Sequence, residues 1–454
     1  MKLFNTLHRT FETIKPIHPP EVSLYACGPT VYDFAHIGNF RTFVFVDLLR
    51  RSLKFLGFRV KHAMNYTDVD DKTIRGAQKA GERLQDYTSK YIHCFLEDCD
   101  TLNLERPEFL IRATEHIPQM IAMIQKLIDQ DYAYISEDGS VYYRVNAFKD
   151  YGCLACLDRA GLQAGARVSQ DEYVKESIGD FALWKSWTPE DGEVKWESPW
   201  GAGRPGWHIE CSAMSTEYLG ETFDLHCGGV DLVFPHHENE IAQSEGASGK
   251  KFVNYWAHAA HLLVNDQKMS KSAGNFFTLR DLLQKGYEGR VIRYTLFATA
   301  HYRQTLNFTW DSLEASKAAI SRLDDWIARF SAYAVKGEWS HQSFIEKFKG
   351  ALEEDLNISE AMAALFDFVR ETNKRMDEEF PVGDLPSVWN QINSVLGLAT
   401  VSHEIPATIQ ALLEARKVAR QTKDWTGSDR IRDEILALGW IVRDTAKGQE
   451  VKKL

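Results

Sequence analysis

The sequence predicts an α/β protein in which a parallel sheet with an insertion is followed by a helical bundle and a small C-terminal domain. Three observations predict this fold class. Strand, helix and strand patterns open the chain, sheet strands return after about residue 205, and apolar residues repeat at helical spacing from about residue 310. The 454 residues also exceed the ~250 to 300 residues of a single hydrophobic core, so we expect several domains.

The first strand and helix are indicated around residue 30. EVSLYACGPT is a short apolar run, and Phe40, Val44 and Leu48 then recur at helical spacing before Gly57 ends the helix. VKHAMNYT follows as an alternating second strand. In a parallel sheet the loop after the first strand lies at the carboxyl edge, where such sheets bind ligands.

The sheet pattern is interrupted and then resumes. IPQMIAMIQKLIDQ is helical, YAYISEDGSVYYRV is typical of a hairpin with its turn at Asp138-Gly139, and a polar, Trp-rich stretch follows. ETFDLHCGG and NYWAHAAHLLV are then expected to be sheet strands, separated by a helix that begins near Pro235. We therefore expect a parallel-sheet domain over 1–310 with an insertion at about 105–205.

Helical periodicity dominates the remainder of the chain. The repeating apolar positions are Phe344, Phe348, Leu352 and Leu356, continued by Met362, Leu365, Phe366 and Val369. Pro406 begins a last helical segment. We expect a helical bundle over 311–399 and a small domain over 400–454.

Composition excludes several classes of protein. Hydrophobic residues make up 44% and charged residues 26%, which excludes disordered and low-complexity chains. No apolar run approaches the ~18 residues of a membrane span and the start lacks a leader pattern, so we expect a soluble, cytoplasmic protein with no membrane contact. Seven cysteines form an odd, sparse set, which favours reduced thiols.

The charge distribution limits where a polyanion could bind. The net charge of −11 disfavours a general coat of nucleic acid but not a local contact. Residues 401–454 contain ten Lys and Arg against eight Asp and Glu, so the C-terminal end is the more permissive place.

Two segments have the chemistry of a nucleotide site. In PTVYDFAHIGN, Gly38 lets the backbone approach a ligand, and His36 and Asn39 are three residues apart and can face the same oxygens. The alternative is that His36 only caps a helix. In the loop region 260–280, Lys268 and Lys271 place two ammonium groups close together, which alone is also compatible with a solvated charge run.

Together, and in this order, these segments resemble the HIGH and KMSKS signatures of class I aminoacyl-tRNA synthetases. The resemblance implies a Rossmann-like catalytic domain that activates an amino acid with ATP and Mg²⁺ and transfers the acyl group to a tRNA. Asn39 departs from the histidine of the signature; its amide keeps two N–H donors, whereas an acid–base role does not follow. The residues to which the resemblance gives catalytic roles are His36, Asn39, Lys268 and Lys271, and those that it places at ATP are Thr30, His36, Gly38, Asn39 and Lys271.

A further set of residues has the chemistry of a zinc site. PHHENE begins a helix, and a spacing of four places His236 and Glu240 on one face while His237 is turned away. Imidazole and carboxylate together with the thiols of Cys27 and Cys211 are zinc ligands by type, although their spacing is not that of a zinc finger.

Here the resemblance narrows to the cysteinyl-tRNA synthetase family. YACGPTVY, NYTDVDDK, GWHIEC and FPHHENE all resemble that family, over nearly the whole chain. The family implies a monomer with ATP, L-cysteine and tRNA(Cys) as substrates and one zinc ion per chain, which favours a thiolate over a hydroxyl. The implied zinc ligands are Cys27, Cys211, His236 and Glu240. Trp207 and Thr67 are candidates for the cysteine pocket; the alternatives are that Trp207 is a core residue and that Thr67 only ends a strand.

Alternatives remain open at this point. A cysteine ligase of the same family that uses a small amino-sugar acceptor would share the activation site, and a non-catalytic tRNA-binding paralogue would have lost it. Residues 400–454 distinguish a tRNA ligase from a ligase for a small acceptor, because they resemble an anticodon-binding domain. Trp425, Arg430 and Arg432 are its candidate tRNA contacts. Trp425 has a second interpretation as a buried anchor of a small fold.

Two further pairs of cysteine and histidine residues are interpreted as structural rather than as metal ligands. Cys153 and Cys156 form a CxxC without a second pair or an adjacent histidine, which argues against a metal site. His226 and Cys227 end a predicted strand and are interpreted as sheet-edge residues.

Overall fold

A computed structural model of the chain describes residues 1–157, 167–168, 179–270, 274–398, 406–422, 424–445 and 448–453. The chain divides into two compact units, Met1–Leu398 and Ala399–Leu454. Each unit has its own hydrophobic core.

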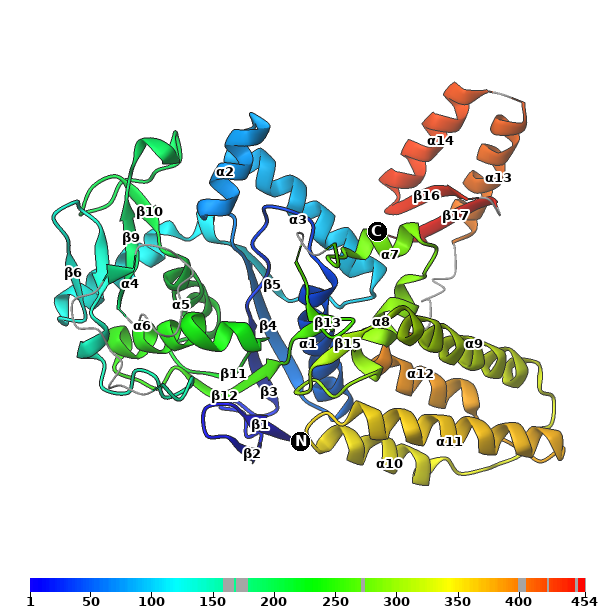
Figure 1. Cartoon of the computed structure of the whole chain (residues 1–454). Helices are drawn as coiled ribbons and strands as arrows, with labels where there is room; N and C mark the ends of the chain where they lie inside the picture. Colours follow the sequence, from blue (N-terminus) through cyan, green and yellow to red (C-terminus); the bar gives the residue numbers. More distant parts are fainter. Residues whose placement is uncertain are drawn as a thin grey trace. The chain divides into compact units, whose positions relative to one another are not determined.

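A five-stranded parallel sheet lies in the middle of the first unit (Figure 1), in the order β12-β11-β3-β4-β5. Its strands are β3 (Glu21–Ala26), β4 (Arg59–Tyr66), β5 (Phe109–Arg112), β11 (Phe223–Gly229) and β12 (Val253–Ala259). The predicted parallel α/β fold is thus confirmed. Every residue of β11 is buried, as expected for a central strand covered on both faces.

Helices cover the sheet and connect its strands. α1 (Ile37–Phe55) is apolar along much of its length, and Phe40, Val44 and Leu49 are fully buried. The connecting helices are α2 (Asp71–Ala80), α3 (Leu84–Thr101), α5 (Trp207–Leu219) and α6 (Glu238–Ser248). A helical turn, Val233–His237, leads directly into α6.

One predicted strand is in fact two. The run NYWAHAAHLLV was expected to form a single sheet strand, but β12 ends at Ala259 and β13 (Leu262–Val264) belongs to another sheet. β13 pairs with β14 (Gln267–Lys268) and β15 (Leu306–Phe308). The chain leaves the main sheet between them because the backbone of Ala260 bonds to the carbonyl of Tyr302.

The interruption of the sheet begins later than about residue 105. β5 is the last strand of the parallel sheet before the interruption and lies inside the range assigned to the insertion, so the insertion begins after Arg112. The insertion contains α4 (Ile117–Asp129) and the strands β6 (Ala133–Ile135), β7 (Val141–Tyr143), β8 (Arg167–Val168), β9 (Asp180–Ser186) and β10 (Gly203–Pro205). Gly139, with φ +83°, forms the turn of the predicted hairpin.

Helices complete the first unit. They are α7 (Leu279–Gln284), α8 (Gly289–Ala298), α9 (Trp310–Ala332), α10 (Gln342–Glu353), α11 (Ile358–Asp377) and α12 (Leu385–Leu396). The predicted apolar stripe does not continue through Leu356, because the chain turns there with φ +56° at Asp355 and +53° at Leu356. The Asp355 carboxylate accepts bonds from the amide of Phe4 and the side chains of Tyr302 and Arg303, and these contacts hold the turn.

The second unit is small. Helices α13 (Ala407–Gln421) and α14 (Trp425–Ala437) pack on each other and on an antiparallel hairpin, β16 (Trp440–Thr445) and β17 (Gly448–Lys453). Its core is built from Ile409, Ile435, Trp440 and Val442. Among the helices of the described residues, none is both long and apolar enough to cross a membrane.

Candidate active site

A cavity of about 510 Å³ opens at the carboxyl edge of the parallel sheet. Three segments at the carboxyl ends of strands form much of its lining: 27–36 at β3, 229 and 231–232 at β11, and 259–263 at β12. Parallel strands bring their carboxyl ends to one edge, which is why residues so distant in sequence share one wall. Of the predicted site residues, Cys27, Thr30, His36, Gly38, Asn39, Trp207 and Lys268 line the cavity.

His36 and Asn39 form the start of α1. The His36 ring accepts a bond from the Asn39 amide at 3.2 Å, and the His36 backbone N–H donates to the Asn39 side-chain oxygen at 3.1 Å. This reciprocal pair is a capping box. The capping interpretation and the pocket interpretation of His36 therefore both hold, since the same ring caps the helix and lines the cavity.

Gly38 is required where the two nucleotide segments meet. A Cβ at this position would lie 2.9 Å from both the His36 ring and the methyl of Met269. The His36 ring packs edge-on against Phe276 at 5.2 Å, and the Ile37 amide donates to the carbonyl of Phe277. The start of α1 is thus joined directly to the segment that follows the lysine loop.

The base of the lysine loop is held by Asn275. Its side-chain oxygen accepts from the Ser270 amide at 2.9 Å and its NH₂ donates to the Lys268 carbonyl at 3.2 Å. Lys268 is exposed and lines the cavity. Lys271, the second predicted lysine, lies outside the described residues.

Four side chains predicted as metal ligands lie together beside the cavity. Cys27 follows β3, Cys211 lies in α5, His236 lies in the turn Val233–His237, and Glu240 lies in the first turn of α6. The sulfurs of Cys27 and Cys211 are 3.8 Å apart, Cys27 Sγ is 3.7 Å from Glu240 Oε1, and His236 Nε2 is 3.1 Å from that same oxygen. All four are buried, and their ligand atoms lie within 4.8 Å of one another.

The electrostatics of this cluster favour a thiolate at Cys211 and a carboxylate at Glu240, whereas burial and the neighbouring Cys211 raise the pKa of the Cys27 thiol. Burial raises the pKa of Glu240, but His226 and His236 outweigh it and lower that pKa to about 2. Burial also raises the pKa of Cys211, yet the hydrogen bond from Cys27 and the charge of His236 bring it down to about 6. A buried thiolate and carboxylate side by side are the groups that a divalent metal binds.

A second, overlapping cluster contains two histidines that sequence reasoning missed. Cys27 and Glu240 are shared with His226 and His237. His226 Nε2 lies 2.9 Å from Glu240 Oε2, and His237 Nε2 lies 3.4 Å from Cys27 Sγ. The interpretation of His226 as a sheet-edge residue is wrong, because β11 is an interior strand and its buried imidazole faces Glu240.

The two residues predicted for the cysteine pocket lie in different surroundings. Trp207 lines the cavity, and its ring centroid is 4.3 Å from that of His236. Thr67 is buried and donates to Glu210 at 3.0 Å, and it is absent from the lining. Asp231, which sequence reasoning missed, does line the cavity, and only its place two residues after the GG that ends β11 could have marked it.

The insertion is joined to the pocket side of the unit by charged groups. The Asp71 carboxylate, at the start of α2, pairs with Lys185 of β9 at 3.2 Å and with Arg204 of β10. Arg204 also pairs with Asp191 at 2.8 Å. These pairs hold the antiparallel sheet against the helix that carries Lys72, another lining residue.

The CxxC turn has a structural explanation. The backbone amides of Gly152 and Ala155 donate to the buried Glu238 carboxylate at 2.7 and 2.9 Å. The turn therefore anchors the insertion to the start of α6. Neither cluster found among the described residues includes Cys153 or Cys156.

The predicted tRNA contacts lie on the surface of the second unit. Trp425 begins α14 and is 57% exposed, so its interpretation as a buried anchor is wrong. The Arg420 guanidinium lies 5.7 Å from the centre of its ring. Arg430 and Arg432 are also exposed, and Arg432 pairs with Asp429 at 3.2 Å.

Comparison with known proteins defines the class first. A family model for the tRNA synthetases class I (C) catalytic domain matches residues 13–318. A methionyl-tRNA synthetase from Mycobacterium tuberculosis, solved in complex with methionyl-adenylate, has the same fold with a TM-score of 0.61 at 12% identity, over 83% of this chain and 88% of that one. The fold and the matched domain are those of a class I aminoacyl-tRNA synthetase.

Two further models match the C-terminal part: a DALR domain over residues 347–400 and a cysteinyl-tRNA ligase anticodon binding domain over 402–451. The cysteine–tRNA ligase of Chlamydia pneumoniae is 50% identical over 99% of this chain and 98% of its own length. That of Protochlamydia amoebophila is 49% identical over 100% and 98%. The chain belongs to the cysteine–tRNA ligase family.

Proposed function

We propose that this chain joins L-cysteine to tRNA(Cys) in an ATP-dependent reaction, through a cysteinyl-adenylate. One observation carries the proposal: a buried set of thiols, imidazole and carboxylate lies at the same cavity as the two nucleotide segments. The relatives named cysteine–tRNA ligase support it over the full length of the chain. The cavity and the metal cluster use residues of a single chain, so the proposed reaction needs no residue from a second copy, and we propose that the enzyme acts as a monomer.

The ligand set fits zinc. With Zn–S near 2.3 Å and Zn–N or Zn–O near 2.0 to 2.1 Å, tetrahedral ligands are separated by about 3.3 to 3.8 Å. The separations of 3.8, 3.7 and 3.1 Å within the cluster are close to that range. We propose that Cys27, Cys211, His236 and Glu240 hold the ion, because two thiols distinguish this set from the histidine-rich alternative.

The metal accounts for substrate choice. When bound, zinc supplies a further coordination position that favours the thiolate of cysteine over the hydroxyl of serine. Shape alone would discriminate poorly, because a small pocket separates similar side chains by only ~1 to 3 kcal/mol. In this proposal Trp207 closes the pocket beside His236, and His226 orients the Glu240 carboxylate through its hydrogen bond.

The remaining site residues act on ATP. The Asn39 NH₂ donates to phosphate oxygens, while Lys268 and Lys271 neutralise charge that develops on the pyrophosphate with Mg²⁺. Phosphoryl chemistry of this kind needs positioning and charge stabilisation rather than covalent help from the protein. Fixing Asn39 in the capping box keeps its amide oriented before ATP arrives.

The small amino-sugar alternative is not favoured. A ligase for a small acceptor has no use for an anticodon-binding domain, yet a model of that description matches residues 402–451. The decisive experiment is cysteine-dependent exchange of pyrophosphate into ATP, followed by charging of unfractionated tRNA. Exchange with charging supports the proposal, and exchange with transfer only to an amino sugar contradicts it.

Trp425 provides a test of tRNA reading. A base in a single-stranded loop stacks on an exposed aromatic side chain for ~1 to 3 kcal/mol. Trp425→Ala should therefore lower kcat/KM for tRNA by roughly 5- to 150-fold and leave pyrophosphate exchange unchanged. Leu436→Ala, a 48% exposed apolar residue of the same helix, is the matched control. Equal effects of the two substitutions would remove Trp425 from the interface.

A further inference from the structure

Buried charged residues connect the helix that starts at the cavity with the last helix of the first unit. α1 begins beside the cavity and carries Asp47 and Arg51, both of which are buried. α12 ends at Leu396, two residues before the end of that unit at Leu398. Arg293 of α8 lies between them and is fully buried.

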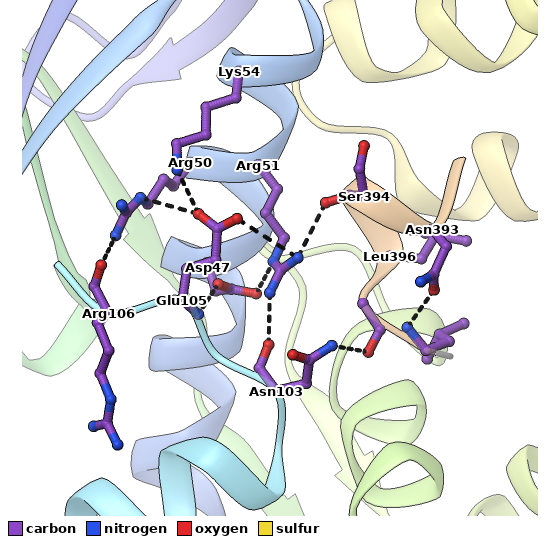
Figure 2. Close-up of polar contacts among 12 residues, drawn as sticks. Asp47, Arg50, Arg51, Lys54, Asn103, Glu105, Arg106, Asn393, Ser394 and Leu396 are labelled. Carbon is purple, nitrogen blue, oxygen red and sulfur yellow. Dashed lines mark hydrogen bonds and ion pairs between the residues drawn. The ribbon is translucent and has the colours of Figure 1, made fainter. Parts of the chain in front are cut away.

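These residues bond to the carboxyl end of α12. Arg51 donates to the Ser394 carbonyl at 3.1 Å and to Asp47 Oδ2 at 2.8 Å (Figure 2). Arg293 donates to the Leu396 carbonyl at 2.8 Å and to that same Asp47 oxygen at 2.6 Å. Side chains from two other helices therefore satisfy carbonyls that the helix itself leaves unpaired.

A loop between α3 and β5 completes the arrangement. Asn103 donates from its side chain to the Gly397 carbonyl at 2.9 Å, and its own carbonyl accepts from Arg51 at 2.7 Å. The Glu105 amide donates to the second Asp47 oxygen at 2.8 Å. We call Asp47, Arg51, Asn103 and Arg293 the exit anchor.

α12 ends in a glycine turn at Gly397, whose N–H donates to the Asn393 carbonyl, and the exit anchor adds buried charged groups to this end. Helix ends at a surface are otherwise commonly satisfied by water. Here two guanidinium groups are taken out of water, and burying paired charges of this kind gives little net stability compared with apolar packing. The arrangement instead gives the end of α12 a defined position, because each of its bonded carbonyls has a side-chain partner from another element.

Gly397 shows how closely the chain is held. It has φ +63°, and a Cβ at this position would lie 3.0 Å from the Arg293 guanidinium. The next amide, that of Leu398, donates to the Asn393 side chain at 2.8 Å. The backbone positions of Gly397 and Leu398, at the end of the first unit, are therefore set by these contacts.

We propose that the residues of the exit anchor are positioning residues for tRNA charging. They fix the end of the first unit, from which the C-terminal unit is tethered, to the helix that carries His36 and Asn39. As a result, a full-length tRNA bound by the C-terminal unit is charged faster than a fragment that contains only the acceptor end. This inference rests on the proposed function. Activation of cysteine does not use the tether and should not depend on it.

The test compares two acceptors. Charging is measured with full-length tRNA(Cys) and with a minihelix that contains only its acceptor arm, alongside pyrophosphate exchange. Gly397→Ala pushes a methyl group against Arg293 and strains the turn, so kcat/KM for full-length tRNA should fall about tenfold or more. Charging of the minihelix and pyrophosphate exchange should stay within about twofold of the unmodified chain.

Gly249→Ala is the matched control. Gly249 ends α6 with φ +67°, and a Cβ at this position would have nothing within 4 Å, so the substitution imposes the same backbone strain without the contact. It should leave the ratio of full-length to minihelix charging unchanged. An equal fall for both acceptors in Gly397→Ala, or no fall for either, would overturn the proposal.

Asn103→Gly gives a second test if Gly397→Ala disrupts the fold. Asn103 has φ +52°, which glycine adopts without strain, so this change removes chiefly the bond to the Gly397 carbonyl. It should lower the same ratio with exchange intact, and an unchanged ratio would contradict the inference. If the unmodified chain itself fails to charge tRNA, the proposed function is at fault rather than the exit anchor.

Discussion

Cys211→Ser is expected to lower zinc content and cysteine activation together, each by about 100-fold or more. Residues that only orient zinc ligands already contribute about 10- to 100-fold to metal affinity or activity, and Cys211 would bind the metal directly. A serine hydroxyl does not ionise near neutral pH, so it is a poor replacement for a thiol whose pKa is lowered to about 6. Metal content by mass spectrometry and pyrophosphate exchange at varied cysteine concentration measure the two effects.

The control for this substitution is Cys227→Ser. Cys227 lies in β11, is as buried as Cys211 and belongs to neither cluster of the described residues. Zinc content and cysteine activation should therefore stay near those of the unmodified chain. Cys211 also separates the two overlapping clusters. If Cys211→Ser retains zinc and His237→Asn loses it, the ion is assigned to the set that contains His226 and His237.

Removal of residues 400–454 should leave pyrophosphate exchange near normal while charging of tRNA falls by about 100-fold or more. The cavity, both nucleotide segments and the metal cluster all lie in the first unit, which has its own core. The loss of several base contacts, each of ~1 to 3 kcal/mol, accounts for the fall. Steady-state charging with tRNA concentration varied is the measurement.

Two results of this truncation would contradict the assignment. Full charging would exclude a role of the second unit in tRNA recognition. Loss of exchange together with charging would mean that the segment supports the fold of the first unit. Thermal unfolding of the truncated chain distinguishes a folded, uncoupled enzyme from a destabilised one.

Local sequence patterns predicted most of the elements that form the cavity. The apolar run before Gly28, the helical spacing from Phe40 and the alternating second strand correspond to β3, α1 and β4. Such patterns are reliable where one element is long and buried, because side-chain period follows directly from backbone geometry. They were less reliable at breaks, as at Ala260 and Leu356, where a contact with another part of the chain ends an element.

The candidate metal ligands also show which properties are local and which depend on the tertiary structure. Their types indicated zinc, and the resemblance to a family named the four, but their spacing carried no pattern. Only the tertiary structure brings Cys27, which follows β3, to Cys211, 184 residues away in α5, because that helix packs against β3 and β4. His226 was misread since nothing local marks an interior strand or reveals that its imidazole meets Glu240.

The sequence by itself determined the α/β class, the two nucleotide segments and the ligand types, since these depend on residue type and on short spacing. The tertiary structure alone decided which groups meet: the capping box that also lines the cavity, the second histidine cluster, and the exposure of Trp425. It also decided the exit anchor, in which Arg51 and Ser394 are 343 residues apart. Contacts of that range arise from how whole elements pack, and no local period encodes them.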